Sequence, residues 1–384
     1  MVAAGALRRI ALSSQPNGSE RGMRPMRKGC RLRHPSLRTA LPCLRTARTL
    51  EHTTMNPTIP APGTSPAVRK PLLARLSVSM FGMVMGVGGL ANAWAAANRI
   101  FGAPIAISQA LLALAVLCFG VLVVAHLAKL VLQFDAVAEE FAHPVRSSFF
   151  PAISVAAIVL SIGVRQYSLA AAHALWCAGA ALHLVFAVVL IRRWILHAQD
   201  EGVMTPAWFI PVVGNILVPV GGVPLGYIEI SWFFFSVGLM LWLSFFTIVL
   251  HRVLFVPAMS QRSMPTLFIL LAPPSIGLSA YLAFTGGQAG AMGDILYCLA
   301  LFIAILLISL ARYIAHGAFF MSWWAMTFPM DGWAGATMGY YAARPSFYTA
   351  AIALVALTLA SGIVVWIACR TALHMASGAA FNED

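Results

Sequence analysis

Charged residues are scarce in this chain of 384 residues. Asp, Glu, Lys and Arg together make up 10% of it, whereas hydrophobic residues make up 60%. A water-soluble fold with this composition could not cover its surface with polar groups, so lipid must be the solvent for much of that surface. The sequence therefore predicts an integral membrane protein.

Paired cysteines and catalytic motifs are also lacking. The six cysteines are scattered, two near the N-terminus and four alone in separate apolar segments: Cys30, Cys43, Cys118, Cys177, Cys298 and Cys369. This spacing indicates neither a disulfide framework nor a metal site. No HExxH, nucleophile-elbow, P-loop or dinucleotide-binding motif occurs in a usable context, so we predict no enzyme, no cofactor and no metal.

Positive charge is concentrated at the N-terminus. Residues 1–70 hold 13 Lys and Arg against two Asp and Glu, whereas residues 71–384 hold 12 against 10. Residues 1–70 have no sustained apolar period, so we expect a basic disordered tail, with Met55 as an alternative start of translation. No aromatic residue alternates with the arginines, so we expect no binding to nucleic acid.

Ten apolar segments follow, each of about 17 to 25 residues, which is enough to cross a ~30 Å hydrocarbon core. We place them at Leu76–Ala97, Ile105–Ala128, Ser147–Gly163, Leu169–Ile191, Pro206–Gly222, Ile228–Leu250, Pro265–Phe284, Ile295–Ala311, Ala318–Tyr341 and Ser346–Cys369. The predicted domains are therefore the tail over residues 1–70, a ten-helix transmembrane domain over 71–372, and a short C-terminal tail over 373–384.

The loops between these segments predict the orientation, because cytoplasmic loops keep Lys and Arg. One side has 11 basic residues, namely Arg69, Lys70, Arg75, Lys129, Arg146, Arg192, Arg193, Arg252, Arg262, Arg312 and Arg370. The other side has three, which are Arg99, Arg165 and Arg344. We therefore expect both termini in the cytoplasm.

Two kinds of span alternate along the chain. The even-numbered spans contain no proline, whereas the third, fifth, seventh and ninth are broken at Pro151, at Pro211 and Pro219, at Pro273 and Pro274, and at Pro329. The first prolines of these breaks are 60, 62 and 56 residues apart, and the first span has glycines at 82, 86, 88 and 89 instead. A regular period of this size predicts five repeated helical hairpins.

A proline within a span frees a backbone carbonyl, which protein or water must then cover. The sequence thus predicts an all-α fold with an inner ring of five Pro- or Gly-kinked helices around a pore and an outer ring of five straight helices. The candidates for lining this pore are Phe149, Phe150, Phe209, Pro151, Pro211, Pro273, Pro274, Pro329 and Gly86.

Ionisable residues are almost absent from the predicted inner spans, which contain only Asp331. Carriers coupled to protons or cations usually place such residues at mid-membrane, so their scarcity argues against strong coupling. The N-termini of broken half-helices attract anions without a fixed cation. The pattern therefore favours a pore for small anions.

Five segments carry a resemblance to a known family. They are HPVRSSFFPA (143–152), TPAWFIPVVGN (205–215), SWFFFSVGLMLW (231–242), PTLFILLAPPSIG (265–277) and SWWAMTFPM (322–330). In this order they resemble the tellurite-resistance/dicarboxylate transporter family, which includes plant slow-type anion channels and bacterial TehA-like proteins.

The resemblance implies a homotrimer of ten-helix protomers in the plasma membrane, which is the inner membrane in bacteria. It also implies one pore in each protomer, closed by a phenylalanine that corresponds to Phe328, or by Met326 if the register differs by two. The solutes of the family are small inorganic or organic anions, so an anion channel or channel-like uniporter is expected. A carrier of malate, sulfite or a tellurite-related oxyanion is the alternative. Asp331 departs from the family pattern and is a candidate modulator of the pore.

Histidines leave one further alternative open. His126, His173 and His183 lie on the second and fourth spans. Facing imidazoles on two helices can hold a haem, which would make the chain a membrane redox protein. Because we expect both spans to be outer helices, we favour polar packing for all three.

Overall fold

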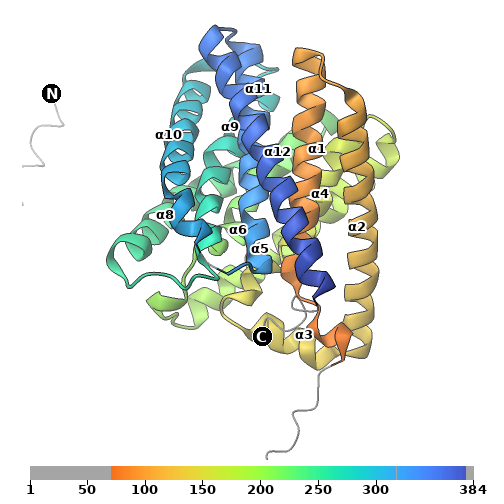
Figure 1. Cartoon of the computed structure of the whole chain (residues 1–384), viewed down its shortest axis with the longest axis vertical. Coiled ribbons are helices and arrows are strands. Elements are labelled where there is room, and N and C mark those ends of the chain that lie inside the picture. The colour runs from red at the N-terminus through yellow and green to blue at the C-terminus, as the bar shows by residue number, and fades with distance from the viewer. Residues whose placement is uncertain (1–70, 317, 378–384) are drawn as a thin grey trace, which may run out of the picture. The chain divides into compact units, whose positions relative to one another are not determined.

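The computed structural model describes residues 71–316 and 318–377, and all regular structure in these residues is helical (Figure 1). Nine helices in this part of the chain are long and apolar enough to cross a membrane. The predicted all-α integral membrane fold is thereby confirmed. The ninth predicted span is not one of these nine helices, so the count of ten stays a prediction. The predicted basic tail, Met55 and the residues from 378 onward lie outside the described residues.

Five long helices are continuous. They are α2 (Ile105–Leu132), α5 (Leu169–Leu196), α8 (Ile228–Phe255), α10 (Gly290–Ala315) and α12 (Phe347–Ala376). In the most apolar stretch of each, only 17% to 33% of the residues are buried. Such helices satisfy their own backbone groups and can face lipid. Because α12 continues to Ala376, it includes the first residues of the predicted C-terminal tail.

The segments between these helices are more buried. In four of them, 67% to 78% of the most apolar stretch is inside the protein. There are five such segments: the first comprises η1 (Leu72–Arg75), η2 (Val78–Met80) and α1 (Phe81–Phe101), and the second comprises η3 (Arg146–Phe149) and α4 (Ala152–Val164). The third follows the short turn η4 (Glu201–Val203) and comprises η5 (Pro206–Trp208), α6 (Phe209–Val213), η6 (Gly214–Leu217), α7 (Val218–Gly222) and η7 (Val223–Leu225). The fourth comprises η8 (Met264–Leu271) and α9 (Ala272–Phe284), and the fifth comprises η9 (Met321–Met326) and α11 (Thr327–Ala343).

Each buried segment with a predicted proline break changes between 3-10 and α-helix near that proline. Pro151 immediately precedes α4, Pro273 and Pro274 lie in the first turn of α9, and Pro329 lies in the first turn of α11. Proline is well tolerated there because a first-turn N–H has no partner within the helix. New α-helices therefore begin part-way along these segments.

The glycines of the first span do not break it. Helix α1 runs continuously from Phe81 to Phe101 through Gly82, Gly86, Gly88 and Gly89. Glycine, unlike proline, keeps its N–H, so no backbone hydrogen bond is lost. The predicted glycine kink of this span stays a prediction, and the glycines bring α1 close to its neighbours.

The buried segments contact one another in sequence. Helix α1 contacts α4, α4 contacts α7, α7 contacts α9, α9 contacts α11, and α11 contacts α1. Each segment also packs against the long helix that follows it, as α11 does against α12 in Figure 1. Every buried segment therefore has two neighbours among the other four.

Polar side chains cover backbone carbonyls at the breaks. Ser154 donates a hydrogen bond to the carbonyl of Pro151 at 2.7 Å, and the Asn215 amide donates to the carbonyls of Pro211 and Val212 at 3.3 and 2.8 Å. The Trp176 indole donates to Val218, where η6 meets α7, at 2.9 Å. Within a bilayer these bonds replace those that water would make elsewhere.

A short helix not predicted from the sequence, α3 (Phe134–Ala142), follows α2. Glu140 of α3 forms an ion pair with Lys129 of α2 at 2.6 Å, and both side chains are almost fully buried. Lys129 also donates to the carbonyl of Leu76, and Glu140 accepts the N–H of Val78. The pair thus fixes the chain that leads into α1 against the α2–α3 corner.

We predict that Lys129→Met lowers the stability by about 3–5 kcal/mol, because it leaves the Glu140 carboxylate buried without its cation. Thermal unfolding of the purified protein in detergent measures the loss. The double variant Lys129→Met/Glu140→Gln should recover most of it, since the glutamine still accepts the N–H of Val78 without carrying charge. Glu139→Gln, at the exposed neighbour of Glu140, is the control and should cost less. Equal stability of Lys129→Met and the native protein would refute a structural role for the pair.

Candidate ion pathway

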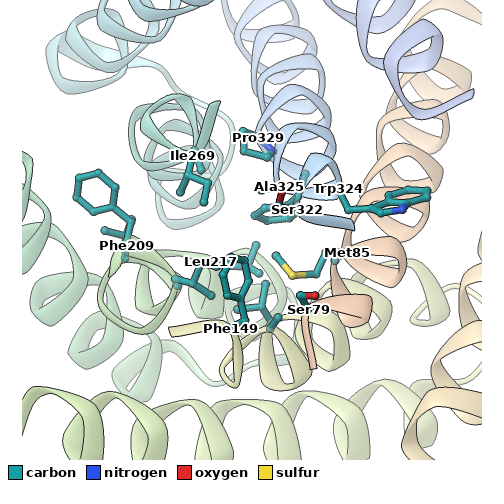
Figure 2. Close-up of a pocket in the computed structure, with 18 of the residues that line it drawn as sticks. Ser79, Met85, Phe149, Phe209, Leu217, Ile269, Ser322, Trp324, Ala325 and Pro329 are labelled. Carbon is teal, nitrogen blue, oxygen red and sulfur yellow. The ribbon is translucent and has the colours of Figure 1, made fainter. Parts of the chain in front are cut away.

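An apolar cavity of about 70 Å³ lies where the breaks of the buried segments meet. All five segments contribute to its wall: Met85 from α1, Phe149 from η3, Leu217 from η6, Ile269 from η8 and Ala325 from η9 are examples (Figure 2). Among the described residues, no ionisable side chain lines the cavity. Its wall is therefore uncharged, as the scarcity of ionisable residues in these segments predicts.

Four of the predicted site residues border this cavity: Phe149, Phe209, Phe328 and Pro329. The ring of Phe209 points away from the middle of the group, whereas Phe149 and Pro329 lie close around it (Figure 2). Phe328 follows the junction between η9 and α11 and is only partly buried, so part of its ring remains uncovered.

The other predicted lining residues lie outside the cavity wall. They are Phe150, Pro151, Pro211, Pro273, Pro274 and Gly86. Phe150 packs edge-on against Phe141 and Phe186, at ring distances of 4.9 and 6.2 Å. The four prolines are buried where helices begin, so they shape the breaks rather than border the space. Met326, the alternative to Phe328, is buried and also lies outside the wall.

Gly86 belongs to a line of contact between α1 and the η9–α11 segment. A Cβ at Gly82 would meet Trp324 at 3.2 Å, one at Gly86 would overlap Thr327, and one at Gly89 would lie 3.0 Å from Asp331. The absence of side chains therefore lets the two segments approach closely. This contact holds the stretch on either side of Phe328 against α1.

Asp331 faces this contact and not the cavity. Its side chain is 2% exposed, and neither carboxyl oxygen has a hydrogen-bond partner among the residues that the structure describes. An isolated carboxylate is very costly in such a setting, so the environment tolerates only the neutral acid.

A polar vestibule of about 640 Å³ adjoins the apolar cavity and shares Ser79, Phe149, Met321 and Ser322 with it. Its formal charge is positive, because four basic side chains and two acidic ones line it. These are Arg75, Lys129, Arg146 and Arg262, and Glu139 and Glu140. The basic vestibule and the cavity that Phe328 borders therefore share part of their walls.

His143 lies on the vestibule wall, where its Nδ1 accepts the N–H groups of Val145 and Arg146 at 3.1 and 3.2 Å. Burial lowers the pKa of His143, and the positive charges of Arg146 and Arg262 lower it further. The imidazole is therefore neutral at neutral pH and caps the start of η3.

The three histidines considered as haem ligands have separate partners. His126 Nδ1 is 2.9 Å from the carbonyl of Leu122, His173 Nδ1 is 2.9 Å from the Tyr227 hydroxyl, and His183 Nδ1 is 2.9 Å from Ser154 Oγ. His173 and His183 are 10 residues apart on α5, or about 15 Å along the helix axis. These contacts favour polar packing for each of them.

Long apolar helices around a small uncharged cavity that adjoins a basic vestibule are typical of a membrane transport protein. Residues 75–372 match the family described as SLAC1, voltage-dependent anion channel, and the chain belongs to this family. The resemblance seen in the five sequence segments is thereby confirmed. A family of channels also agrees with the prediction that the chain is not an enzyme.

Individual relatives come from a plant and a bacterium. The chain is 28% identical to the S-type anion channel SLAH3 of Arabidopsis thaliana and 26% identical to the guard cell S-type anion channel SLAC1 of the same plant, over 79% of its own length in both cases. It spans only 49% and 56% of those two proteins. It is also 23% identical to the tellurite resistance protein TehA homolog of Haemophilus influenzae, over 69% of this chain and 81% of that one.

Asp331→Asn replaces a neutral acid with a neutral amide of similar shape, away from the cavity wall. We therefore expect the pH dependence of anion flux in liposomes to be the same in this variant as in the native protein. A shifted pH profile in a variant that assembles normally would instead place a titrating Asp331 on the pathway.

Proposed function

We propose that this protein conducts small anions passively through a pore that the five buried segments surround and that Phe328 closes. The main support is the position of Phe328 on the wall of an apolar cavity that shares four residues with a basic vestibule. Membership of an anion channel family supports the class of solute. The closed series of contacts among the buried segments supports a ring around the pore.

The vestibule suits the first step of anion entry. An excess of positive charge in a concave, partly buried surface raises the local concentration of anions. We propose that this end faces the cytoplasm, in agreement with the distribution of Lys and Arg between the loops. Both termini then lie on that side of the plasma membrane.

The apolar cavity suits a barrier that opens by movement of one ring. An aromatic ring carries no fixed charge, and its edge is mildly positive, so a rotated Phe328 can border the open path without repelling an anion. The uncharged wall offers no site for a coupling ion, which favours a channel over a coupled carrier. A homotrimer with one pore in each protomer remains the proposed assembly.

A carrier of dicarboxylates, sulfite or tellurite-related oxyanions is the second candidate. It is favoured by the similarity to the TehA homolog, whose name refers to tellurite resistance and most of whose length the chain matches. Flux assays in liposomes with chloride, nitrate, malate and sulfite separate the substrates. Anion currents that follow the Nernst potential and ignore a proton gradient support the channel, whereas obligatory proton coupling contradicts it.

The gate proposal predicts that Phe328→Ala assembles normally and conducts far more anion than the native protein, because the ring that closes the cavity is removed. Phe328→Leu should conduct an intermediate amount. Planar bilayer recordings or chloride efflux from liposomes measure both.

Met326→Ala is the matched control, since this neighbouring buried side chain lies outside the cavity wall. It should lose stability without gaining conductance. If Phe328 only packs between helices, its truncation costs about 3–5 kcal/mol and gives poorly folded protein without new conductance. Native conductance in a well-folded Phe328→Ala protein would rule out the gate.

A further inference from the structure

His183 of α5 is completely buried beside the cavity wall. Its Nδ1 lies 2.9 Å from Ser154 Oγ, and that hydroxyl also donates to the carbonyl of Pro151 at 2.7 Å. The imidazole is therefore fixed in place at the break that precedes α4.

The second ring nitrogen of His183 is the informative atom. Nε2 of His183 is buried without a hydrogen bond in the part of the chain that the structure describes. Because Ser154 gives its single hydroxyl proton to the Pro151 carbonyl, Nδ1 of His183 must carry a proton and donate it to Ser154 Oγ, which leaves Nε2 as an unprotonated acceptor. A buried polar atom left in this way needs an explanation beyond packing.

Nε2 faces Gly214, which lines the cavity. A Cβ built at Gly214 would lie 2.7 Å from His183 Nε2 and 3.3 Å from a methyl group of Val155, another residue of the cavity wall. The histidine thus occupies the space of a side chain that Gly214 lacks. Gly214 therefore lies both against the imidazole edge and on the cavity wall.

No charged group compensates His183. Among the described residues, no charged side chain from α4, from η6 or from α5 itself interacts electrostatically with His183. The imidazole is therefore affected only by its removal from water. A positive charge at this position is costly while the cavity is empty, because it has neither water nor a counter-ion. An anion in the cavity supplies the missing counter-charge across Gly214.

We propose that His183 is an anion-recognition residue of the apolar cavity, which takes up a proton when a small anion occupies the cavity beside Gly214. This inference rests on the proposed function, since it requires the anion to pass through the cavity. The proton moves from solvent to Nε2 and stays on the protein, so the driving force for the anion is unchanged.

Binding of the proton and the anion must then help each other equally, because coupling between two sites is reciprocal. Acid pH raises the occupancy of the cavity by anions, and anions raise protonation of His183. Asp331 cannot produce this effect, because a nearby anion favours the neutral acid that its surroundings already require. The sign of the pH response therefore distinguishes the two residues.

The test is chloride flux through the purified full chain in liposomes, with the same pH on both sides, in the native protein and in Phe328→Ala. Lowering the pH from about 7.5 to about 5.5 should raise the flux about fivefold or more, a factor typical of coupled sites. His183→Gln, whose amide can still bond to Ser154 but cannot carry charge, should conduct with little dependence on pH. His173→Gln, on the same helix but bonded to Tyr227, should keep the native response.

The outcomes are separable. Flux that does not respond to pH in the native protein, or a native pH response in folded His183→Gln, overturns the role of His183 and leaves the channel intact. Absence of chloride flux from both the native protein and Phe328→Ala contradicts the proposed function itself.

A second measurement needs no substitution at His183. Nitrogen NMR of histidine-labelled native protein in detergent at about pH 6 should show one buried imidazole becoming protonated as chloride is added. Spectra of His173→Gln and His143→Gln exclude those two residues as its source. Absence of any chloride-dependent protonation overturns the proposal even if His183→Gln fails to assemble.

Discussion

The need to satisfy every backbone carbonyl away from water determines much of this structure. Prolines interrupt four of the membrane segments, and each interruption leaves carbonyls that lipid cannot bond. Ser154 and Asn215 donate hydrogen bonds to carbonyls next to the breaks of their own segments, and Trp176 of α5 donates to the carbonyl of Val218 in α7. Residues from all five buried segments meet in one place. The apolar cavity is a consequence of this arrangement.

Close packing of α1 against the η9–α11 segment positions the side of the cavity that carries Phe328. Three glycines on one segment lie against Trp324, Thr327 and Asp331 of the other. A methyl group added at the middle glycine would overlap Thr327, so this contact allows little displacement of one segment against the other. Phe328 lies between two of these contact points, and its position is therefore tied to the α1 surface.

Two environments in series suit the passage of an anion. The vestibule has excess positive charge and many hydroxyl groups, whereas the cavity has almost no polar surface. The vestibule can attract anions by its charge, whereas the cavity can exclude water by its apolar wall. His183, located behind Gly214, adds a group that can be charged when the cavity is occupied and neutral when it is empty. Such a group can stabilise an anion in transit without trapping it permanently.

Composition and proline spacing were sufficient to predict a membrane protein of alternating continuous and broken helices, because hydrophobic length and the missing proline N–H act locally. The same pattern made Phe149, Phe209 and Pro329 candidates for the pore, the family resemblance added Phe328, and the structure brings these four residues to one cavity. The sequence could not exclude Phe150 or Gly86 from that wall, nor pair Lys129 with Glu140 or place His183 behind Gly214. Those facts depend on the rotation of each helix about its axis and on which helices touch, and only the packing of the whole chain decides them.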